Sequence, residues 1–359
     1  EKQVGYSRMI GDFDDLIDLS SGSEACLPPA LTNLATPNPA DIDTQPEHTV
    51  LYLPLPFFYA RDTGVALPTA ALPYNDMTID FEFRNWDELL IGELAANNAN
   101  SEYRRRVSLL ELQGEPVLSG VEVWGNYALV SNDERKRMAC APRDILIEQA
   151  QWMMPKVYRP RITPSPRLDL RLSHAIKVLF FAVRNTTFAA ERSWYAVGSP
   201  MMGSPALVPN KFSGQFQSID PLAYSTLVYE NVNRLNRMDA LYYSHLNPYY
   251  HAPNIPEVTG LHSYSYSLDF ICLDPMGSTN YGKLSHVSII PEPSIVAVAA
   301  NGQTGSGSLT RLPLQGGSTV PPSPNTSGVN IQQNYEFVLY AINLNIIRIS
   351  GGSLGFPIL

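Results

Sequence analysis

The chain has 359 residues, of which 44% are hydrophobic and 16% are charged, and its formal net charge is -9. The charged fraction is well below the roughly 25% of an ordinary soluble chain, which fits a surface that packs against copies of itself. A negative net charge does not suit a protein that wraps nucleic acid directly. No apolar run reaches the ~18 residues of a membrane span. The 30 prolines and 23 glycines indicate many corners and few long helices.

Residues 51–90 combine closely spaced prolines with many aromatic side chains. Pro54 and Pro56 exclude a helix at their position, and the RDTG sequence at 61–64 is typical of a turn. Residues 77–84 (MTIDFEFR) alternate apolar and polar side chains, which predicts a half-buried strand with Asp80 and Glu82 on its polar outer face. The stretch is therefore expected to form two strands joined by a proline-framed corner.

A capping box at 131–134 marks the start of a helix. The hydroxyl of Ser131 can accept a hydrogen bond from the backbone of Glu134, and Glu134 can answer back. The box predicts a short basic helix that ends at Pro142. Because a helix after a run of strands marks a domain boundary, we expect one domain at 1–140 and a second at 141–359.

Further strands are expected where apolar residues alternate or form short continuous runs. The predicted strands are 107–112, 121–130, 144–153, 168–171, 176–183, 225–230, 263–272, 284–290, 334–338 and 341–349. At 144–153 both helix and strand fit, and the surrounding strands favour a strand. Residues 246–256 predict a second proline-framed aromatic corner, and 191–222 and 298–330 predict long exposed loops. This pattern predicts an all-β fold of the jelly-roll type.

No motif carries a complete set of catalytic or metal-binding groups. The GGSLG sequence at 351–355 matches a nucleophile elbow but has no acid or histidine after it, so it predicts a glycine-rich turn. Residues 302–309 (GQTGSGSL) lack the lysine of a phosphate loop. The histidines show no metal-site spacing; they are His48, His174, His245, His251, His262 and His286. We therefore predict no catalytic, cofactor-binding or metal site, and no enzymatic activity.

The three cysteines are odd in number and far apart in the sequence. Cys26, Cys140 and Cys272 form neither a disulfide framework nor a zinc cluster. We expect three reduced and mostly buried thiols, as in an intracellular protein.

Two kinds of surface residue suggest a role in glycan chemistry. The sequons at Asn185 and Asn325 are acceptor sequences, which we expect to stay unmodified because no signal peptide opens the sequence. Tyr249 and Tyr250 could stack on sugars, which leaves a lectin-like or glycan-processing jelly roll as the alternative function. Packing in the core and at the corners explains the aromatic residues more simply.

Several long stretches resemble the major capsid proteins of iridoviruses. They are LPLPFFYARDTGVALPTAALPYN, SNDERKRMACAPRDILIEQ, LSHAIKVLFFAVRN, LNPYYHAPNIP, DPMGSTNYGKL and IIRISGGSLGFPIL. They occur in the order of the family and cover essentially the whole chain, and related ascoviruses share much of the pattern. Members of the family carry a further section before the GYSRMIG segment, which supplies opening strands of the first sandwich. Because the chain begins at Glu1 without that section, we expect it to be truncated at its N-terminus.

The resemblance implies a double jelly roll, with 1–140 as the remainder of the N-terminal sandwich and 141–359 as the C-terminal sandwich. It implies a structural protein that forms homotrimeric, pseudo-hexagonal capsomers of an icosahedral virus shell. The implied partners are the chain itself, neighbouring capsomers and minor capsid proteins, with the internal viral membrane reached through other proteins and no direct nucleic acid. The resemblance implies no cofactor, and it places the protein in the virion, assembled in the host cytoplasm.

Overall fold

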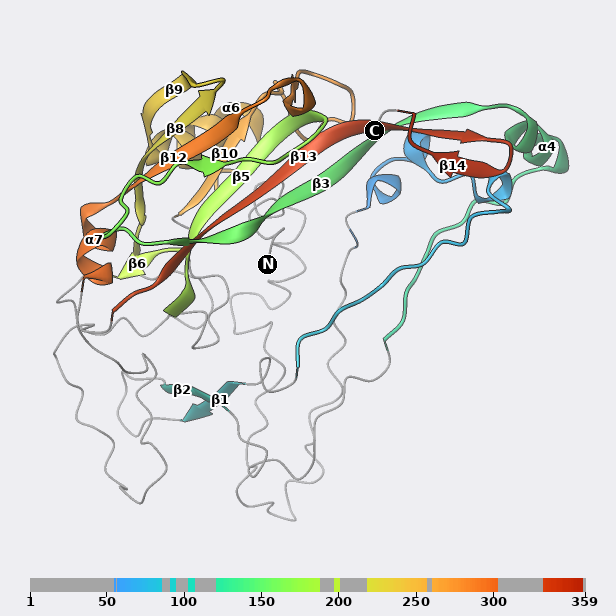
Figure 1. Ribbon diagram of the computed structural model, residues 1–359. Helices are drawn as coiled ribbons and strands as arrows, with labels where there is room; N and C mark the ends of the chain where they lie inside the picture. The colour runs from blue at the N-terminus through green and yellow to red at the C-terminus, as the bar shows by residue number, and fades with distance from the viewer. Residues whose placement is uncertain are drawn as a thin grey trace, which may run out of the picture.

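The computed structural model describes residues 55, 57–85, 91–94, 103–106, 121–187, 197–200, 218–256, 260–302 and 332–357 (Figure 1). Strands dominate these ranges. The strands are β1 (Ile91–Leu94), β2 (Tyr103–Arg106), β3 (Arg143–Tyr158), β4 (Leu168–Asp169), β5 (Ala175–Asn185), β6 (Ser199–Pro200), β7 (Ser218–Ile219), β8 (Leu222–Tyr229), β9 (Val232–Asp239), β10 (Leu261–Ser265), β11 (Thr279–Asn280), β12 (Val287–Pro293), β13 (Tyr335–Ser350) and β14 (Ser353–Gly355).

The helical elements are short. They are η2 (Phe58–Ala60), η3 (Thr63–Val65), η4 (Thr69–Ala71), α4 (Asn132–Cys140), η6 (Tyr242–Leu246), α6 (Asn247–His251), η7 (Tyr281–Lys283) and α7 (Ile295–Asn301). Half of the predicted capping box is confirmed at the start of α4, where the Ser131 hydroxyl accepts from the backbone N–H of Glu134 at 3.3 Å. The Glu134 carboxylate does not close the box from its side chain but pairs with Arg143 at 3.4 Å.

The C-terminal half forms a jelly-roll sandwich. Its eight main strands in chain order are β3, β4, β5, β8, β9, β10, β12 and β13. One sheet has the strand order β3-β13-β5-β10, which are the first, eighth, third and sixth of these strands. The other sheet has the order β4-β12-β8-β9, which are the second, seventh, fourth and fifth. All these pairings are antiparallel. This strand order is the double Greek key of a jelly roll, so the predicted all-β jelly-roll fold is confirmed.

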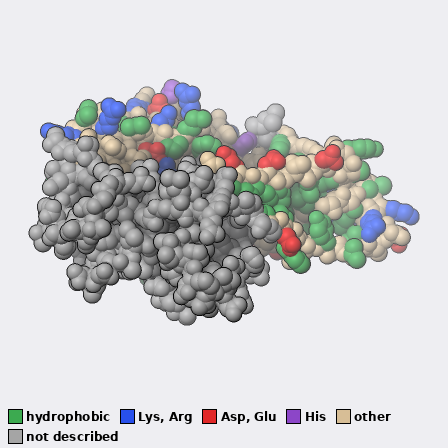
Figure 2. Space-filling model, turned by 90° about the horizontal axis from the view of Figure 1, so that it is seen from below, with side chains coloured by type: hydrophobic (Ala, Val, Ile, Leu, Met, Phe, Trp, Pro, Cys, Tyr) green, Lys and Arg blue, Asp and Glu red, His purple; other side chains and the backbone are tan. Residues whose placement is uncertain are grey.

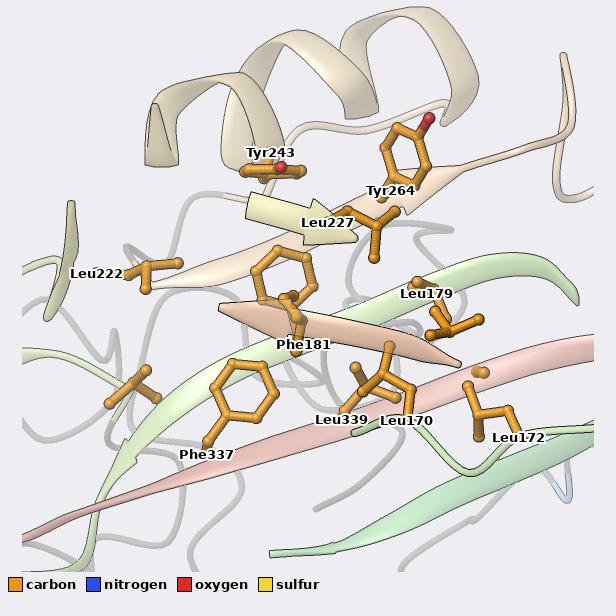
Figure 3. Close-up of a cluster of buried hydrophobic side chains, with 14 of the residues drawn as sticks. Leu170, Leu172, Leu179, Phe181, Leu222, Leu227, Tyr243, Tyr264, Phe337 and Leu339 are labelled. Carbon is orange, nitrogen blue, oxygen red and sulfur yellow. The ribbon is translucent and has the colours of Figure 1, made fainter. Parts of the chain in front are cut away.

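The main core lies between the two sheets (Figure 3). Phe181 of β5 sits at its centre, with its ring 5.2 Å from that of Tyr243 and 6.0 Å from that of Phe337. Leu222 and Leu227 of the facing sheet close the cluster from the other side. Burial of each such side chain stabilises the fold by roughly 1.5–3 kcal/mol.

Strand β5 is covered on both faces, as its continuous apolar run predicts. Val178 and Phe180 point away from the main core into a second cluster. There the Phe180 ring meets Phe270 edge-on, with ring centroids 5.6 Å apart, and lies 6.1 Å from the ring of Tyr340. A strand buried on both faces has no polar side to present, which explains why its sequence does not alternate.

Strands β3 and β13 are each 16 residues long and extend past the sandwich (Figure 1). Their far ends carry a third apolar cluster, in which Ile145 and Ile347 are buried. Residues 57–75, called the corner below, contain η2, η3 and η4 and pack on this cluster through Ala71 and Leu72. The corner thus packs on strands of the C-terminal half.

Two expected strands of the first half are wrong. Residues 77–84 and 121–130 form no strand, and their apolar side chains are exposed, except that of Val130, which is half-buried. Val123 and Tyr127 are 55% and 80% exposed, although their place in the alternation predicts burial. Among the described residues, neither segment has a strand beside it, so nothing there covers the apolar face that the alternation creates. The expected strand at 107–112 lies outside the described residues.

Other local expectations need correction. Strands β2 (Tyr103–Arg106) and β9 (Val232–Asp239) form where the sequence pattern predicts no strand. The second corner at 246–256 is instead a π-helical turn followed by α6. The expected strand at 263–272 ends at Ser265, and the two expected strands at 334–338 and 341–349 are one strand, β13. Residues 298–301, expected to belong to a long loop, are instead the end of α7, and 303–331 lie outside the described residues.

Candidate functional site

The GGSLG sequence forms a hairpin turn and not a nucleophile elbow. Ser350 pairs with Ser353 across the turn between β13 and β14, and Gly351 and Gly352 have φ of 62° and 84°. Two successive residues with positive φ favour glycine and suit a tight hairpin. No helix follows Ser353, and its hydroxyl donates to the Ser350 carbonyl at 3.4 Å, so the turn predicted from the sequence is confirmed.

The described histidines serve packing and local hydrogen bonding. The imidazole of His262 is buried, stacks on Phe181 with ring centroids 5.2 Å apart, and contacts the Asp220 carboxylate through Nε2 at 2.8 Å. His251 contacts the Leu268 carbonyl through Nδ1 at 2.9 Å. The described part of the chain has no group of three or more side chains that could hold a metal ion. It also has no helix long and apolar enough to span a membrane.

Both described cysteines are free, but neither is fully buried. Cys140 is exposed at the end of α4, a helix with no buried residue, and Cys272 is half-buried in a loop. The expectation of buried thiols is therefore wrong for these two. Cys26 lies outside the described residues.

The two candidate glycan features differ in accessibility. The side chain of Asn185 is fully buried, and its amide donates to Gln333 Oε1 at 2.9 Å and to the Gly198 carbonyl at 3.4 Å. An acceptor amide in this setting is closed to a modifying enzyme. Tyr249 and Tyr250 are 67% and 68% exposed, so packing in the core does not explain them.

A cavity of about 620 Å³ lies beside the corner. Its lining residues are Phe57, Phe58, Glu148, Gln149, Ala150, Gln151, Ser173 and His174. The Gln151 amide already bonds the backbone of Ser173 in both directions at 2.9 Å and donates to Asn343 Oδ1 at 3.0 Å. Ser173 and His174 both line the cavity, but the Ser173 hydroxyl is directed to Gln151 Oε1 at 3.5 Å and not to the imidazole, so the lining shows no serine bonded to an activating base.

A cluster of polar side chains lies at one end of the sandwich. Asn185 bonds Gln333 and Gly198 as above, and the Ser199 hydroxyl lies 2.7 Å from that of Tyr335. The Asn301 amide donates to the Gln333 carbonyl at 2.8 Å. These residues flank two stretches of sequence, 201–217 and 303–331. Both stretches therefore begin and end at one end of the sandwich.

Comparisons with known proteins place this architecture in a class. A family model described as "Large eukaryotic DNA virus major capsid protein" matches residues 134–312, and one described as "Major capsid protein N-terminus" matches residues 1–130. Major capsid proteins of Invertebrate iridescent virus 6 and Costelytra zealandica iridescent virus are 47% and 48% identical to the chain over 359 residues. Each alignment covers 100% of this chain and 69% of the relative.

A more divergent relative and a solved structure extend the comparison. The major capsid protein of Lymphocystis disease virus 1 is 41% identical, with 100% of this chain and 68% of the relative covered. A chain in the quasi-atomic model of the PBCV-1 virus capsid has a TM-score of 0.45 and 17% identity to this protein. That match covers 64% of this chain and 55% of the solved chain.

The chain belongs to the major capsid protein family of large eukaryotic DNA viruses. Its relatives at 47–48% identity are the iridovirus proteins, which confirms the family resemblance found in the sequence. It is a structural component of a virus capsid, which assembles with copies of itself into the shell, and it is not an enzyme. The family does not favour the lectin-like alternative.

Proposed function

We propose that the chain assembles as a homotrimer and that these trimers are the pseudo-hexagonal capsomers of an icosahedral shell. The observation that carries the proposal is the cluster of loop stems at one end of the jelly roll. Among the described residues, Asn185, Gln333 and Asn301 tie the stems of both loops together. Insertions that leave the sandwich at one end can project from a shell while the rest of the molecule contacts neighbouring chains.

Further hydrogen bonds hold the residues that flank the two loops, which supports a role for the loops as an outer layer. Thr186 donates through its backbone to the Asn334 carbonyl at 2.8 Å, and Arg161 donates to the Gly302 carbonyl at 2.9 Å. The loops themselves are rich in Gly, Ser, Thr and Pro. We propose that both loops form the outer towers of the capsomer.

The remaining partners follow from the same proposal. Neighbouring capsomers and minor capsid proteins contact the chain within the shell, and the internal viral membrane is reached through other proteins. Assembly takes place in the host cytoplasm, without direct contact to nucleic acid. The low charged fraction of 16% supports extensive protein contacts over a solvated free surface.

Native mass measurement over a range of concentrations tests the trimer. The expected species has about 119 kDa, three times the 39.7 kDa of one chain. A species that stays at the mass of a single chain at the highest soluble concentration would contradict the proposal.

Trypsin digestion of the trimer tests the position of the loops. Arg311 offers a cleavage site inside the second loop. If the loop projects outward, cleavage after Arg311 should proceed as fast in the trimer as in the dissociated chain. Protection of Arg311 in the trimer would place this loop in a contact between chains and would refute the outer towers.

A further inference from the structure

An ion pair attaches the N-terminal end of the corner to the sandwich. The guanidinium of Arg61 pairs with the carboxylate of Glu148 on β3, and its second nitrogen donates to the Ile271 carbonyl at 2.8 Å. The Glu148 side chain is almost fully buried, and Arg61 is largely covered. An ion pair shielded in this way is screened far less by solvent than one on the surface.

The same carboxylate also serves a buried lysine. Lys177 of β5 is fully buried, and its ammonium donates to Glu148 and to the Cys272 carbonyl. Because a buried ammonium needs a partner, Lys177 fixes where the Glu148 carboxylate lies. The sandwich therefore presents an oriented anion to the corner, and Arg61 is the group of the corner that binds it.

The second end of the corner is held by the C-terminal hairpin. The backbone N–H of Tyr74 donates to the Gly352 carbonyl at 3.4 Å, and the N–H of Leu354 donates to the Asn75 side chain at 3.1 Å. The Tyr74 ring packs on Gly352 so closely that a Cβ there would lie 2.7 Å from a ring carbon. Residues 74–75 and 352–354 are thus fitted to each other.

Between its two ends the corner contributes buried apolar groups. Ala71 and Leu72 are buried against Ile145 and Ile347, and Phe58 packs on the same cluster. The corner consists of three single-turn helices without strand pairing to the sandwich. Such short helices are not stable alone, so the corner depends on its seat.

We infer that the corner is a latch that joins the first part of the chain to the C-terminal sandwich and closes cooperatively at both ends. Arg61 and the Gly352 hairpin are its two fastenings, about 290 residues apart in sequence. The seat is complete only when β14 is present, so docking of the corner requires the chain through residue 355. This inference is independent of the trimer.

Hydrogen exchange of the full 359-residue chain tests the latch with two variants, Arg61→Gln and Gly352→Ala. Each should raise exchange at least about tenfold across all of 57–75, because opening one end releases the other. The strands β5 and β8 should keep their protection in both variants. The decisive result is at the end of the corner away from the substitution, where Arg61→Gln should raise exchange at Tyr74 and Asn75.

Matched variants separate the latch from general damage. Arg237→Gln removes an ion pair to Glu292 at 3.0 Å on the other sheet, and a Cβ at Gly355 would meet nothing within 4 Å. Neither Arg237→Gln nor Gly355→Ala should change exchange in the corner. If Gly352→Ala does not fold, Asn75→Ala tests the same end by removing one hydrogen bond. Exchange that rises only next to the altered residue, or not at all, would overturn the cooperative latch.

Discussion

Alternation of apolar and polar residues occurs in both halves of the chain, but it leads to buried side chains in one half and exposed side chains in the other. In β13 the side chains of Phe337, Leu339 and Ala341 alternate into the main core and are buried. At 77–84 the apolar residues alternate as regularly, yet they are exposed along an extended backbone. Figure 2 shows hydrophobic side chains gathered on the surface at the end of the molecule that carries α4 and β14.

The difference is one of partners. Strand β13 pairs with β5 on one side and β3 on the other, and the facing sheet closes over it. The described residues offer no such neighbour to 77–84 or 121–130. Alternation determines which face of a strand is apolar. That face stabilises the fold only when a second sheet covers it.

The largest expected effect is the loss of stability when a core side chain of β13 is truncated, compared with the same change in 77–84. Phe337→Ala should lower the free energy of unfolding by about 3–5 kcal/mol, because it leaves a cavity in the main core. The matched change Phe81→Ala, in the exposed segment, should stay within about 0.5 kcal/mol of the parent. Urea unfolding followed by circular dichroism measures both, and equal losses would show that 77–84 is as well packed as β13.

Alkaline titration sharpens the same contrast through the tyrosines of the sandwich. Burial raises the pKa of Tyr266 and of Tyr281, whose hydroxyl oxygens lie 2.7 Å apart. A raised folded-state pKa gives stability that is complete below the ordinary value of about 10 and is lost as pH rises above it. Phenolate absorbance from these residues should appear only together with loss of circular dichroism. Ionisation before unfolding would mean that the cluster is open to water.

A smaller effect concerns solubility. Replacing Phe83 and Trp124 by Ser should reduce light scattering at high concentration, since both side chains are exposed apolar groups on extended backbone. The melting temperature should stay unchanged. Tyr249→Ser, at an exposed aromatic residue on α6, serves as the control and should leave scattering as it was. If Tyr249→Ser lowered light scattering as much as the Phe83 and Trp124 changes, the two segments would not be the particular source of association.

The smallest effect is an acid-sensitive surface pair at the far end of β3 and β13. Hydrogen bonds from Arg348, at 2.7 and 2.6 Å, hold the pKa of Asp144 below its usual range. A lowered folded-state pKa gives stability that is present above the ordinary value of about 3.9 and is lost as pH falls through the folded value. Asp144→Asn should therefore lower the melting temperature slightly at neutral pH and have no effect in strong acid. A difference that persists in strong acid would contradict this origin.

The sequence predicts correctly those elements whose signal lies within a few neighbouring residues. The apolar run of β5 is too hydrophobic for anything but a covered strand, and the Ser131 cap and the Gly351-Gly352 turn are local chemistry. Strand β9 was missed because it lies at the edge of its sheet, where most of its side chains are exposed and carry no periodic signal.

The contacts of the latch were beyond a local reading of the sequence. Lys177 stands inside an apolar run, and its partner Glu148 lies 29 residues earlier in another strand. Arg61 and Glu148 are 87 residues apart. Such pairs follow from the strand order of the sandwich, which the hydrophobic pattern does not encode. A lysine in a fully buried run was the one signal that an anion had to lie nearby.

The comparison rests on the claim that β5 and β13 are paired strands, whereas 77–84 and 121–130 have no strand beside them among the described residues. Hydrogen exchange of the free chain, resolved along the sequence, tests this most directly. The account predicts that amides in β5 and β13 exchange at least about a thousandfold more slowly than those of the two segments. Comparable protection in all four would contradict it.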